Sequence, residues 1–280
     1  MRAVSLHRDV LLISSAVLHV NCVIVRAGVE EASASTVGGP IEVVPPVPAG
    51  ETFVIDSPVL PDELDALPAL IGQAGFPPAS GLLATHADWD HLLGRLAFPG
   101  LALGCARSSA SRLAGEPGSA QRELRAFDEE LYISRPAPLA LGSVQALPVP
   151  GHCAIASREL ELHPTGGHTP DGMAIWIEWA HVLVVGDYLS PVEIPALNEG
   201  GSIDAYEATL TVLEPLLERA AHVVPGHGPA IDRDRAGAIL AEDLDYLQAL
   251  RERGGDAPLP AGRRTPGQRE LHDQNVAELS

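Results

Sequence analysis

The stretch Thr85–Gly94 (THADWDHLLG) places two histidines and two aspartates within six residues, at His86, Asp88, Asp90 and His91. Apolar runs stand on both sides of this group, with GLLA before it and Leu92-Leu93 after it. Burying several ionisable side chains beside apolar sequence costs free energy unless a cation or close partners compensate for them. Two interpretations are open at this point. The stretch is either a polar turn in which Asp88 or Asp90 caps a helix, or one part of a metal site.

Three more polar residues share the same context, because each follows a β-type run and sits in a glycine-rich turn. They are His168 in TGGHT, Asp187 in GDY and His227 in PGHG. Strand ends with glycine-rich turns can present side chains without covering them. A single histidine in such a place is more often structural than functional. Four histidines and three aspartates, all at strand ends, favour a shared metal site.

Taken in order, these residues resemble the metallo-β-lactamase superfamily, whose signature is H-x-H-x-D-H followed downstream by His, Asp and His. The resemblance covers nearly the whole chain, from the strands near Val20 to the helix after His227. The run FVID before the first motif and the glyoxalase II-like ending VVPGHG support it. The resemblance implies an α/β (α+β) fold, a four-layer αββα sandwich of two mixed β-sheets flanked by helices. The metals would lie at one edge, between the sheets.

The resemblance also implies which residues bind which metal. His86, Asp88 and His168 would bind the first ion, Asp90, His91 and His227 the second, and Asp187 would bridge them. Two divalent ions can hold a bridging hydroxide and polarise a carbonyl or phosphoryl oxygen. The candidate catalytic residues are therefore Asp90 and Asp187, together with Tyr188. The tyrosine could donate a hydrogen bond to an oxyanion, or it is an ordinary packed aromatic residue.

Asp88 departs from the family pattern, which has a second histidine at this position. The extra carboxylate makes two divalent ions, three aspartates and one hydroxide formally neutral. Zinc is the usual metal of the family, but carboxylate ligands favour harder ions such as iron or manganese. Flavodiiron proteins of the same superfamily also place a carboxylate here. Replacing Asp88 by histidine is therefore expected to move the metal preference toward zinc.

The composition excludes several classes of function. The 280 residues carry a net charge of −19 with a pI near 4.8, and all 18 basic residues are arginine. A strongly acidic surface repels phosphate backbones and anionic membranes, so neither nucleic acid nor a membrane is an expected partner. The absence of lysine excludes Schiff-base and Walker-type mechanisms. The expected partner is a small-molecule substrate, and the oligomeric state stays open.

The three cysteines are an odd number without a C-x-x-C pair, which argues against a disulfide framework and a zinc ribbon and fits a reducing cytoplasm. The apolar run Val10–Leu18 resembles a short signal region, but Asp9 interrupts its basic flank and no clear cleavage site follows. No apolar stretch approaches the length needed to span a bilayer. We therefore expect a cytoplasmic protein.

The resemblance implies one metallo-β-lactamase-like domain over 1–253. The segment over 254–280 is rich in Pro, Gly and Arg and then polar, so we expect a loosely packed C-terminal tail there. Residues 28–50 are predicted to be a loop or an extended hairpin, because prolines exclude a central strand there. Two helical pieces over 107–131 carry four arginines whose expected place is a solvated helix face. They are Arg107, Arg112, Arg122 and Arg125.

These observations predict a metal-dependent hydrolase whose dinuclear centre cleaves a small ester-like bond: a thioester, a lactone or a phosphoester. Two alternatives remain open. One is an iron-dependent oxidoreductase of the same fold, of the persulfide dioxygenase or di-iron type. The other is a non-catalytic metal-binding protein.

Overall fold

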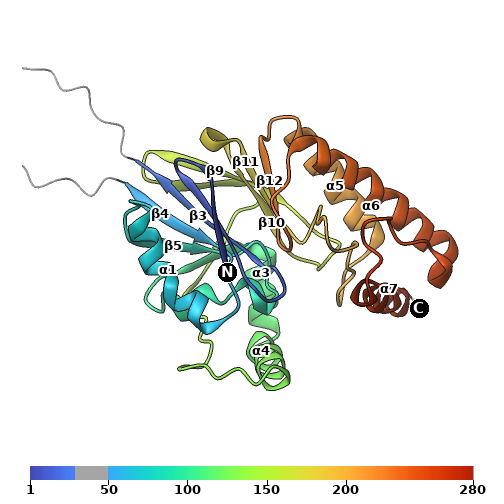
Figure 1. The fold of residues 1–280 in the computed structure, drawn as a ribbon, viewed down its shortest axis with the longest axis horizontal. Coiled ribbons are helices and arrows are strands. Elements are labelled where there is room, and N and C mark those ends of the chain that lie inside the picture. The colour runs from blue at the N-terminus through green and yellow to red at the C-terminus, as the bar shows by residue number, and fades with distance from the viewer. Residues whose placement is uncertain (29–49, 280) are drawn as a thin grey trace, which may run out of the picture.

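The computed structural model describes residues 1–28 and 50–279, and the predicted loop over 28–50 lies almost wholly outside them. The strands form two mixed sheets (Figure 1). The first sheet has the order β1-β2-β3-β4-β5-β6-β7, antiparallel up to β4 and parallel beyond it. Its strands are β1 (Arg2–His7), β2 (Val10–Ser14), β3 (Asn21–Ala27), β4 (Glu51–Ile55), β5 (Ala79–Leu83), β6 (Leu103–Ala106) and β7 (Val144–Leu147).

The second sheet has the order β12-β11-β10-β9-β8. Only its β11–β12 pair is parallel, and the other pairs are antiparallel. The strands are β8 (Gly151–Ile155), β9 (Arg158–Pro164), β10 (Met173–Ile177), β11 (Val182–Gly186) and β12 (His222–Pro225).

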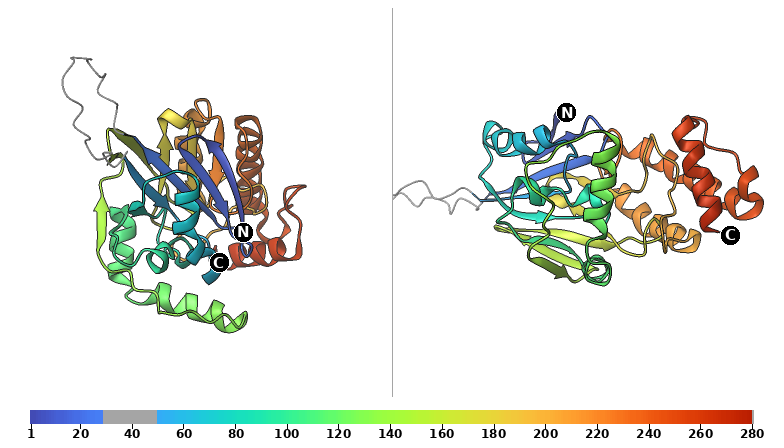
Figure 2. Two further views of the ribbon diagram at one scale, coloured as in Figure 1. Left: turned by 60° about the vertical axis from the view of Figure 1, so that its left-hand side comes forward. Right: turned by 90° about the horizontal axis from the view of Figure 1, so that it is seen from below.

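Helices cover the outer faces of both sheets, so the molecule has four layers (Figures 1 and 2). The first sheet is covered by the helices that precede β7, and the second by α5 and α6. The predicted αββα architecture is confirmed. The helices are α1 (Pro61–Gln73), α2 (Gly94–Ala97), α3 (Arg107–Gly115), α4 (Ser119–Glu130), α5 (Ile203–Leu217), α6 (Arg233–Arg253) and α7 (Pro266–Glu278).

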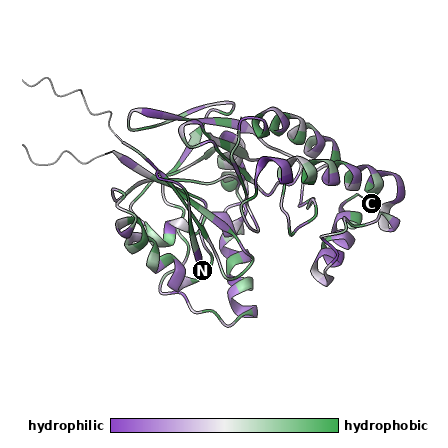
Figure 3. Cartoon of the chain, turned by 45° about the horizontal axis from the view of Figure 1, so that its top comes forward, coloured by the Kyte–Doolittle hydropathy of each residue, from purple (hydrophilic) through white to green (hydrophobic). Residues whose placement is uncertain are grey.

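Three apolar clusters hold the layers together. The central cluster lies between the sheets, where Val23 and Ile55 of the first sheet pack with Ile175 and Val184 of the second. One outer cluster joins α1 to the first sheet, and the other joins α5 and α6 to the second. The buried strands β10 and β11 are accordingly made almost entirely of apolar residues, while the outer helices are mixed (Figure 3). Among the described helices, none is both long and apolar enough to cross a bilayer.

The C-terminal tail differs from its prediction. Residues 254–279 form a short 3₁₀ turn and α7, and Arg263 and Asn275 are completely buried there. The expectation of a loosely packed tail is therefore wrong. The polar composition of the tail suggested exposure, but several of its polar side chains form buried hydrogen bonds instead. A polar residue that finds its partners inside the protein leaves no hydrophobic signal in the sequence.

Candidate metal centre

The seven candidate ligands meet at one end of the sandwich, because their segments follow the ends of strands that point the same way. The segment with His86 follows β5, His168 lies in the turn between β9 and β10, Asp187 directly follows β11, and His227 follows β12. A 3₁₀ turn at Trp89–His91 brings the rest of the first motif back toward the same place. Four distant segments of the chain thus present side chains to one another.

The ligand atoms form two groups around Asp88 and Asp90. In the first group, Asp88 Oδ2 lies 3.6 Å from His86 Nε2 and 3.4 Å from His168 Nε2. In the second, Asp90 Oδ2 lies 3.8 Å from His91 Nε2 and 3.4 Å from His227 Nε2. These are the two groups that the resemblance implied, and in each the three ligand atoms lie within 4.8 Å of one another.

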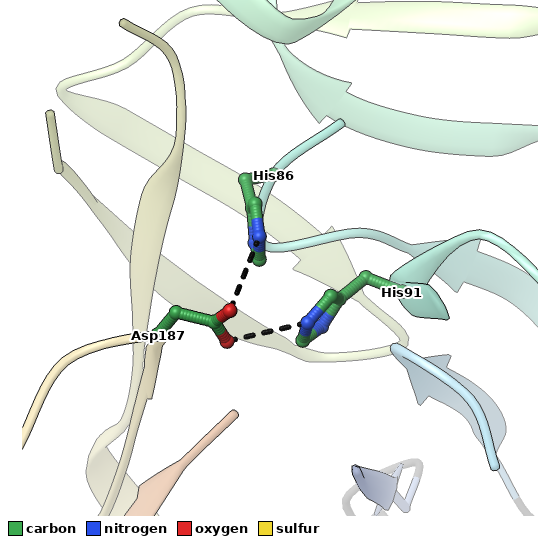
Figure 4. Close-up of side chains that lie close together, drawn as sticks. All are labelled: His86, His91 and Asp187. Carbon is green, nitrogen blue, oxygen red and sulfur yellow. Dashed lines mark ion pairs between the residues drawn. The ribbon is translucent and has the colours of Figure 1, made fainter. Parts of the chain in front are cut away.

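Asp187 lies between the two groups and contacts both (Figure 4). Its Oδ2 is 3.6 Å from His86 Nε2 and 3.2 Å from His168 Nε2. The same oxygen is 3.4 Å from His227 Nε2, and Oδ1 is 3.2 Å from His91 Nε2. One carboxylate therefore faces all four imidazoles. A residue that bridges two ions would have to lie in this position.

The residues fit a pair of divalent cations. Ligand atoms about 2.1 Å from a tetrahedral ion lie about 3.4 Å from one another, close to the spacings within both groups. In the described part of the chain, His86 Nε2, His91 Nε2 and Asp187 Oδ1 are buried without a hydrogen-bond partner. Buried polar atoms are normally paired, so three such atoms at one point indicate that a cation is their partner. Imidazole and carboxylate donors suit zinc, iron and manganese.

The ring nitrogens of His91 and His86 that point away from the centre are both linked to Asp56, directly for His91 and through Thr85 for His86. His91 Nδ1 lies 3.0 Å from Asp56 Oδ2, at the end of β4. His86 Nδ1 lies 3.1 Å from Thr85 Oγ1, and that hydroxyl donates to Asp56 Oδ2 at 2.8 Å. Such contacts orient a histidine and leave Nε2 free for a metal. Asp56 supports two ligands at once, a role that the sequence did not reveal beyond its place in FVID.

The other two histidines use backbone carbonyls. His168 Nδ1 lies 3.0 Å from Ala196 O, and His227 Nδ1 lies 2.8 Å from Leu18 O. These acceptors belong to a loop after β11 and to the β2–β3 turn. Any residue can supply a backbone carbonyl, so no sequence motif could have pointed to either contact.

Asp88 has two partners that the sequence analysis missed. Arg112 Nη1 donates to Asp88 Oδ1 at 2.7 Å, and Asn198 Nδ2 donates to Oδ2 at 2.9 Å. Arg112 also donates to Asp171 Oδ1 at 3.0 Å, and its side chain is only 19% exposed. The prediction that Arg112 lies on a solvated helix face is therefore wrong. The same contacts exclude Asp88 as a side-chain helix cap, and the structure shows no such cap for it.

The hydroxyl group of Tyr188 is not free to donate a hydrogen bond to an oxyanion. Its hydroxyl donates to Gly166 O at 2.6 Å and accepts from His168 N at 3.1 Å. The ring packs against Tyr206, and the side chain is buried. The hydroxyl hydrogen is thus already used inside the protein. We correct the catalytic assignment: Tyr188 holds the turn that carries His168.

The carboxylates of the centre change the pKa values of its histidines. Burial lowers the pKa of His227, but the contacts with Asp187 and the charges of Glu193 and Asp90 together outweigh burial, and the pKa rises to about 10. The pKa of His91 is raised well above its ordinary value in the same way, against burial and by the charge of Asp187. Burial raises the pKa of Asp187, yet the charges of His227 and His91 hold it well below its usual range. In the metal-free protein, the carboxylates therefore favour the protonated forms of His91 and His227.

This arrangement predicts how the stability of the metal-free protein depends on pH. A histidine with a raised folded-state pKa stabilises the fold fully below its unfolded pKa and progressively less as the pH rises through its folded pKa. For His227, this stabilisation is lost between pH 6.5 and about pH 10. Urea unfolding of chelator-treated protein should show a falling free energy of unfolding across this window. The Asp187→Asn variant should show a weaker fall, and an equal slope in both proteins would contradict the assignment.

The comparisons with known proteins agree with this geometry. The family model described as the metallo-beta-lactamase superfamily matches residues 47–227, which is more than half of the chain. The chain belongs to this superfamily. No curated protein matches the chain. The members of the superfamily are mostly hydrolases, which supports an enzyme in general terms.

Solved structures show the same fold at low sequence identity. A metallo-beta-lactamase from Pontibacter korlensis is 18% identical with a TM-score of 0.60, and the match covers 88% of this chain and 98% of that one. A metallo-beta-lactamase family protein from Thermus thermophilus is 19% identical with a TM-score of 0.61, over 98% and 93%. The inverting sec-alkylsulfatase Pisa1 from Pseudomonas sp. is 13% identical with a TM-score of 0.68, over 99% of this chain and 49% of that one.

Proposed function

We propose that the protein is a metal-dependent hydrolase that uses two divalent ions to cleave a small ester-like bond. The observation that carries the proposal is the position of Asp187, whose carboxylate faces the imidazoles of both ligand groups. A shared carboxylate between two three-residue groups is suited to a pair of ions rather than one. Thioesters, lactones and phosphoesters are the substrate classes, and the fold shared with an alkylsulfatase adds sulfate esters to the panel.

The chain's own residues have separate tasks in this proposal. When bound, the two ions would supply a hydroxide nucleophile at neutral pH and polarise the reacting oxygen of the substrate. His86, Asp88 and His168 hold one ion, while Asp90, His91 and His227 hold the other. Asp187 fixes the distance between the groups. Its Oδ1 and Asp90 Oδ2 are the carboxylate oxygens on the Asp90 side, where they can accept a proton from the attacking water.

Metal analysis and a substrate panel test the proposal. Protein purified without added metal should contain about two divalent ions per chain, and should hydrolyse at least one member of an ester, thioester, lactone, phosphoester and sulfate-ester panel. Asp187→Asn, which keeps the size but removes the charge, should lose metal and activity together. Asp204→Asn is the matched control, because Asp204 is exposed in the first turn of α5. Full metal content and activity in Asp187→Asn would refute the proposal.

A second candidate function rests on Asp88. A carboxylate in the first group suits iron, and an iron-dependent oxidoreductase would consume oxygen with its substrate. Oxygen uptake measured beside the metal content separates the two functions. Iron together with substrate-dependent oxygen uptake favours the oxidoreductase, and zinc or manganese with hydrolysis favours the hydrolase. A metal-loaded chain that is inactive in both assays favours a non-catalytic metal-binding protein.

A further inference from the structure

The loop 190–198 lies between the first ligand group and the C-terminal segment. On its inner side it contacts the ligands directly. Ala196 O accepts from His168 Nδ1 at 3.0 Å, and Asn198 Nδ2 donates to Asp88 Oδ2 at 2.9 Å. Asn198 N also donates to His168 O at 2.8 Å. Two of the three ligands of the first group therefore depend on where this loop lies.

The outer side of the same loop is held by α7 and the segment before it. Gln268 Oε1 accepts from the backbone N–H of Ile194 at 2.6 Å. Asn275 donates to the carbonyl of Pro195 at 2.7 Å and accepts from the N–H of Leu197 at 2.8 Å. The two contacts of Asn275 thus enclose Ala196, the residue whose carbonyl faces His168.

Arg263 adds a third attachment just before α7. Its Nη1 donates to Glu193 O at 2.8 Å and to Asp243 Oδ1 at 2.5 Å, so it joins the loop to α6. Arg263 and Asn275 are completely buried, and Gln268 is 9% exposed. Breaking a buried hydrogen bond leaves a desolvated polar group unpaired, which costs free energy. The loop is therefore held by groups that cannot exchange their partners for water.

The second ligand group is supported from elsewhere. Two residues directly after β4 support it. Asp56 orients His91, and Ser57 Oγ donates to the carbonyl of Asp90 at 3.3 Å. The loop's contacts with His227 come from its first residues: Ser190 donates to His227 O at 2.9 Å, and Glu193 Oε1 lies 3.8 Å from His227 Nδ1. A displacement of residues 194–198 should thus act mainly on His168 and Asp88.

We propose that the segment Arg263–Asn275 is a positioning element of the metal centre. It fixes loop 190–198 in the conformation that orients His168 and Asp88, and it thereby sets the affinity of the first metal site. The proposal deepens the proposed function and rests on the dinuclear centre. Removing a direct partner of a metal ligand typically changes metal affinity by about 10–100-fold, and the segment acts through such a partner, the carbonyl of Ala196.

Asn275→Leu tests the proposal, with His272→Leu as the matched control. His272 is also a buried residue of α7, but it contacts Tyr246 and Gly255 O rather than the loop, and its connection to Asn275 runs through the Tyr246 hydroxyl. Competition titrations with Zn²⁺ and a chromophoric chelator should show an affinity about tenfold or more weaker at one of the two sites in Asn275→Leu. His272→Leu should keep both affinities, even where its melting temperature falls. Gln268→Leu, at the edge of the core, should act in the same direction if Asn275→Leu does not fold.

Hydrogen exchange on the metal-free variants gives a readout that does not depend on bound metal. Asn275→Leu should speed exchange at the amides of Ile194, Ala196, Leu197 and Asn198, while His272→Leu leaves them unchanged. Equal effects of the two variants on affinity and exchange would overturn the proposal, as would unchanged values in Asn275→Leu and Gln268→Leu. If the native chain binds no metal, the proposed function and the claim about affinity fail together, and exchange then decides only whether α7 orders the loop.

Discussion

Replacing Asp88 by histidine alone is expected to weaken metal binding at the first group instead of producing the two-histidine site of the family signature. Asp88 Oδ1 accepts from Arg112 Nη1 at 2.7 Å, inside a largely buried contact. A histidine in this place would face a guanidinium group that cannot lose its proton. Burial lowers the pKa of Arg112, but the charge of Asp88 raises it far above its ordinary value. In the variant Arg112 loses that contribution, but it keeps its charge because Asp171 Oδ1 still accepts from it at 3.0 Å and a guanidinium does not lose its proton in a protein.

Arg112 is the reason why the simple exchange is expected to fail. The guanidinium repels a cation held by the new imidazole and also disfavours protonation of that imidazole. Asn198, the other partner of Asp88, is more tolerant, because its amide can turn to present either its oxygen or its nitrogen. Asp88 and Arg112 are thus coupled, and replacing Asp88 alone leaves Arg112 with Asp171 as its remaining buried carboxylate partner.

The double variant Asp88→His/Arg112→Leu is expected to recover the metal that the single variant loses, and to prefer zinc over iron or manganese. Metal content and zinc affinity of the native chain, both single variants and the double variant complete a double-mutant cycle. We expect the loss in Asp88→His to be about 10–100-fold in affinity, and a large part of it to disappear in the double variant. If the two changes are additive, the contact between Asp88 and Arg112 does not govern the metal site.

This contact also changes the charge argument made from the sequence. The carboxylate of Asp88 shares its charge with Arg112, so it is a weaker ligand than a free carboxylate. Asp171 faces Arg112 as well and accepts from Ala87 N at 3.0 Å through its other oxygen. Including Arg112 and Asp171 in the count leaves the formal net charge of the site at zero, but the contact with Arg112 draws negative charge away from the ions. The preference for iron or manganese over zinc should therefore be smaller than the ligand count alone suggests.

The clustering of the seven candidate ligands was predictable from the sequence because each of them lies in a short motif at a strand end. The residue types and their order were enough to imply both groups, and the structure brings those groups together around Asp187. The layers were predictable for a related reason. Apolar runs such as Val182–Val185 and amphipathic helices bury surface locally, so their pattern is visible in a single segment.

The supporting residues were not predictable, because their signal is a contact between distant segments. Arg112 lies 24 residues from Asp88 on a helix with several charges, and its sequence neighbours resemble an exposed surface. Asn275 and Gln268 lie in a polar tail that shows no apolar period. The edge strand β1 carries no signal for another reason: it contains no buried residue, so its residues do not alternate between apolar and polar. Burial of polar groups is decided by tertiary packing.

Gly226→Ala is expected to disrupt the metal centre without touching a ligand. Gly226 lies in the turn between β12 and His227, and it donates to Gly186 O at 2.6 Å across the two parallel strands. A Cβ atom at this position would overlap Asp187 Oδ1 and lie 3.1 Å from its Cγ. The bare backbone of the glycine therefore leaves the space that the central carboxylate occupies. Asp187 contacts all four imidazoles, so moving it alters both ligand groups.

The alanine variant should lose metal and about 100-fold or more in activity, the effect of displacing a reacting group by about 1 Å. Gly237→Ala is the control, because Gly237 lies in α6 and a Cβ there meets no atom within 4 Å. A helical glycine replaced by alanine is stabilising by about 0.5–1 kcal/mol, so the control should melt slightly higher. A folded Gly226→Ala protein with native metal content and activity would mean that Asp187 can leave its position freely. In that case a rigid carboxylate between the two groups is not what organises the centre.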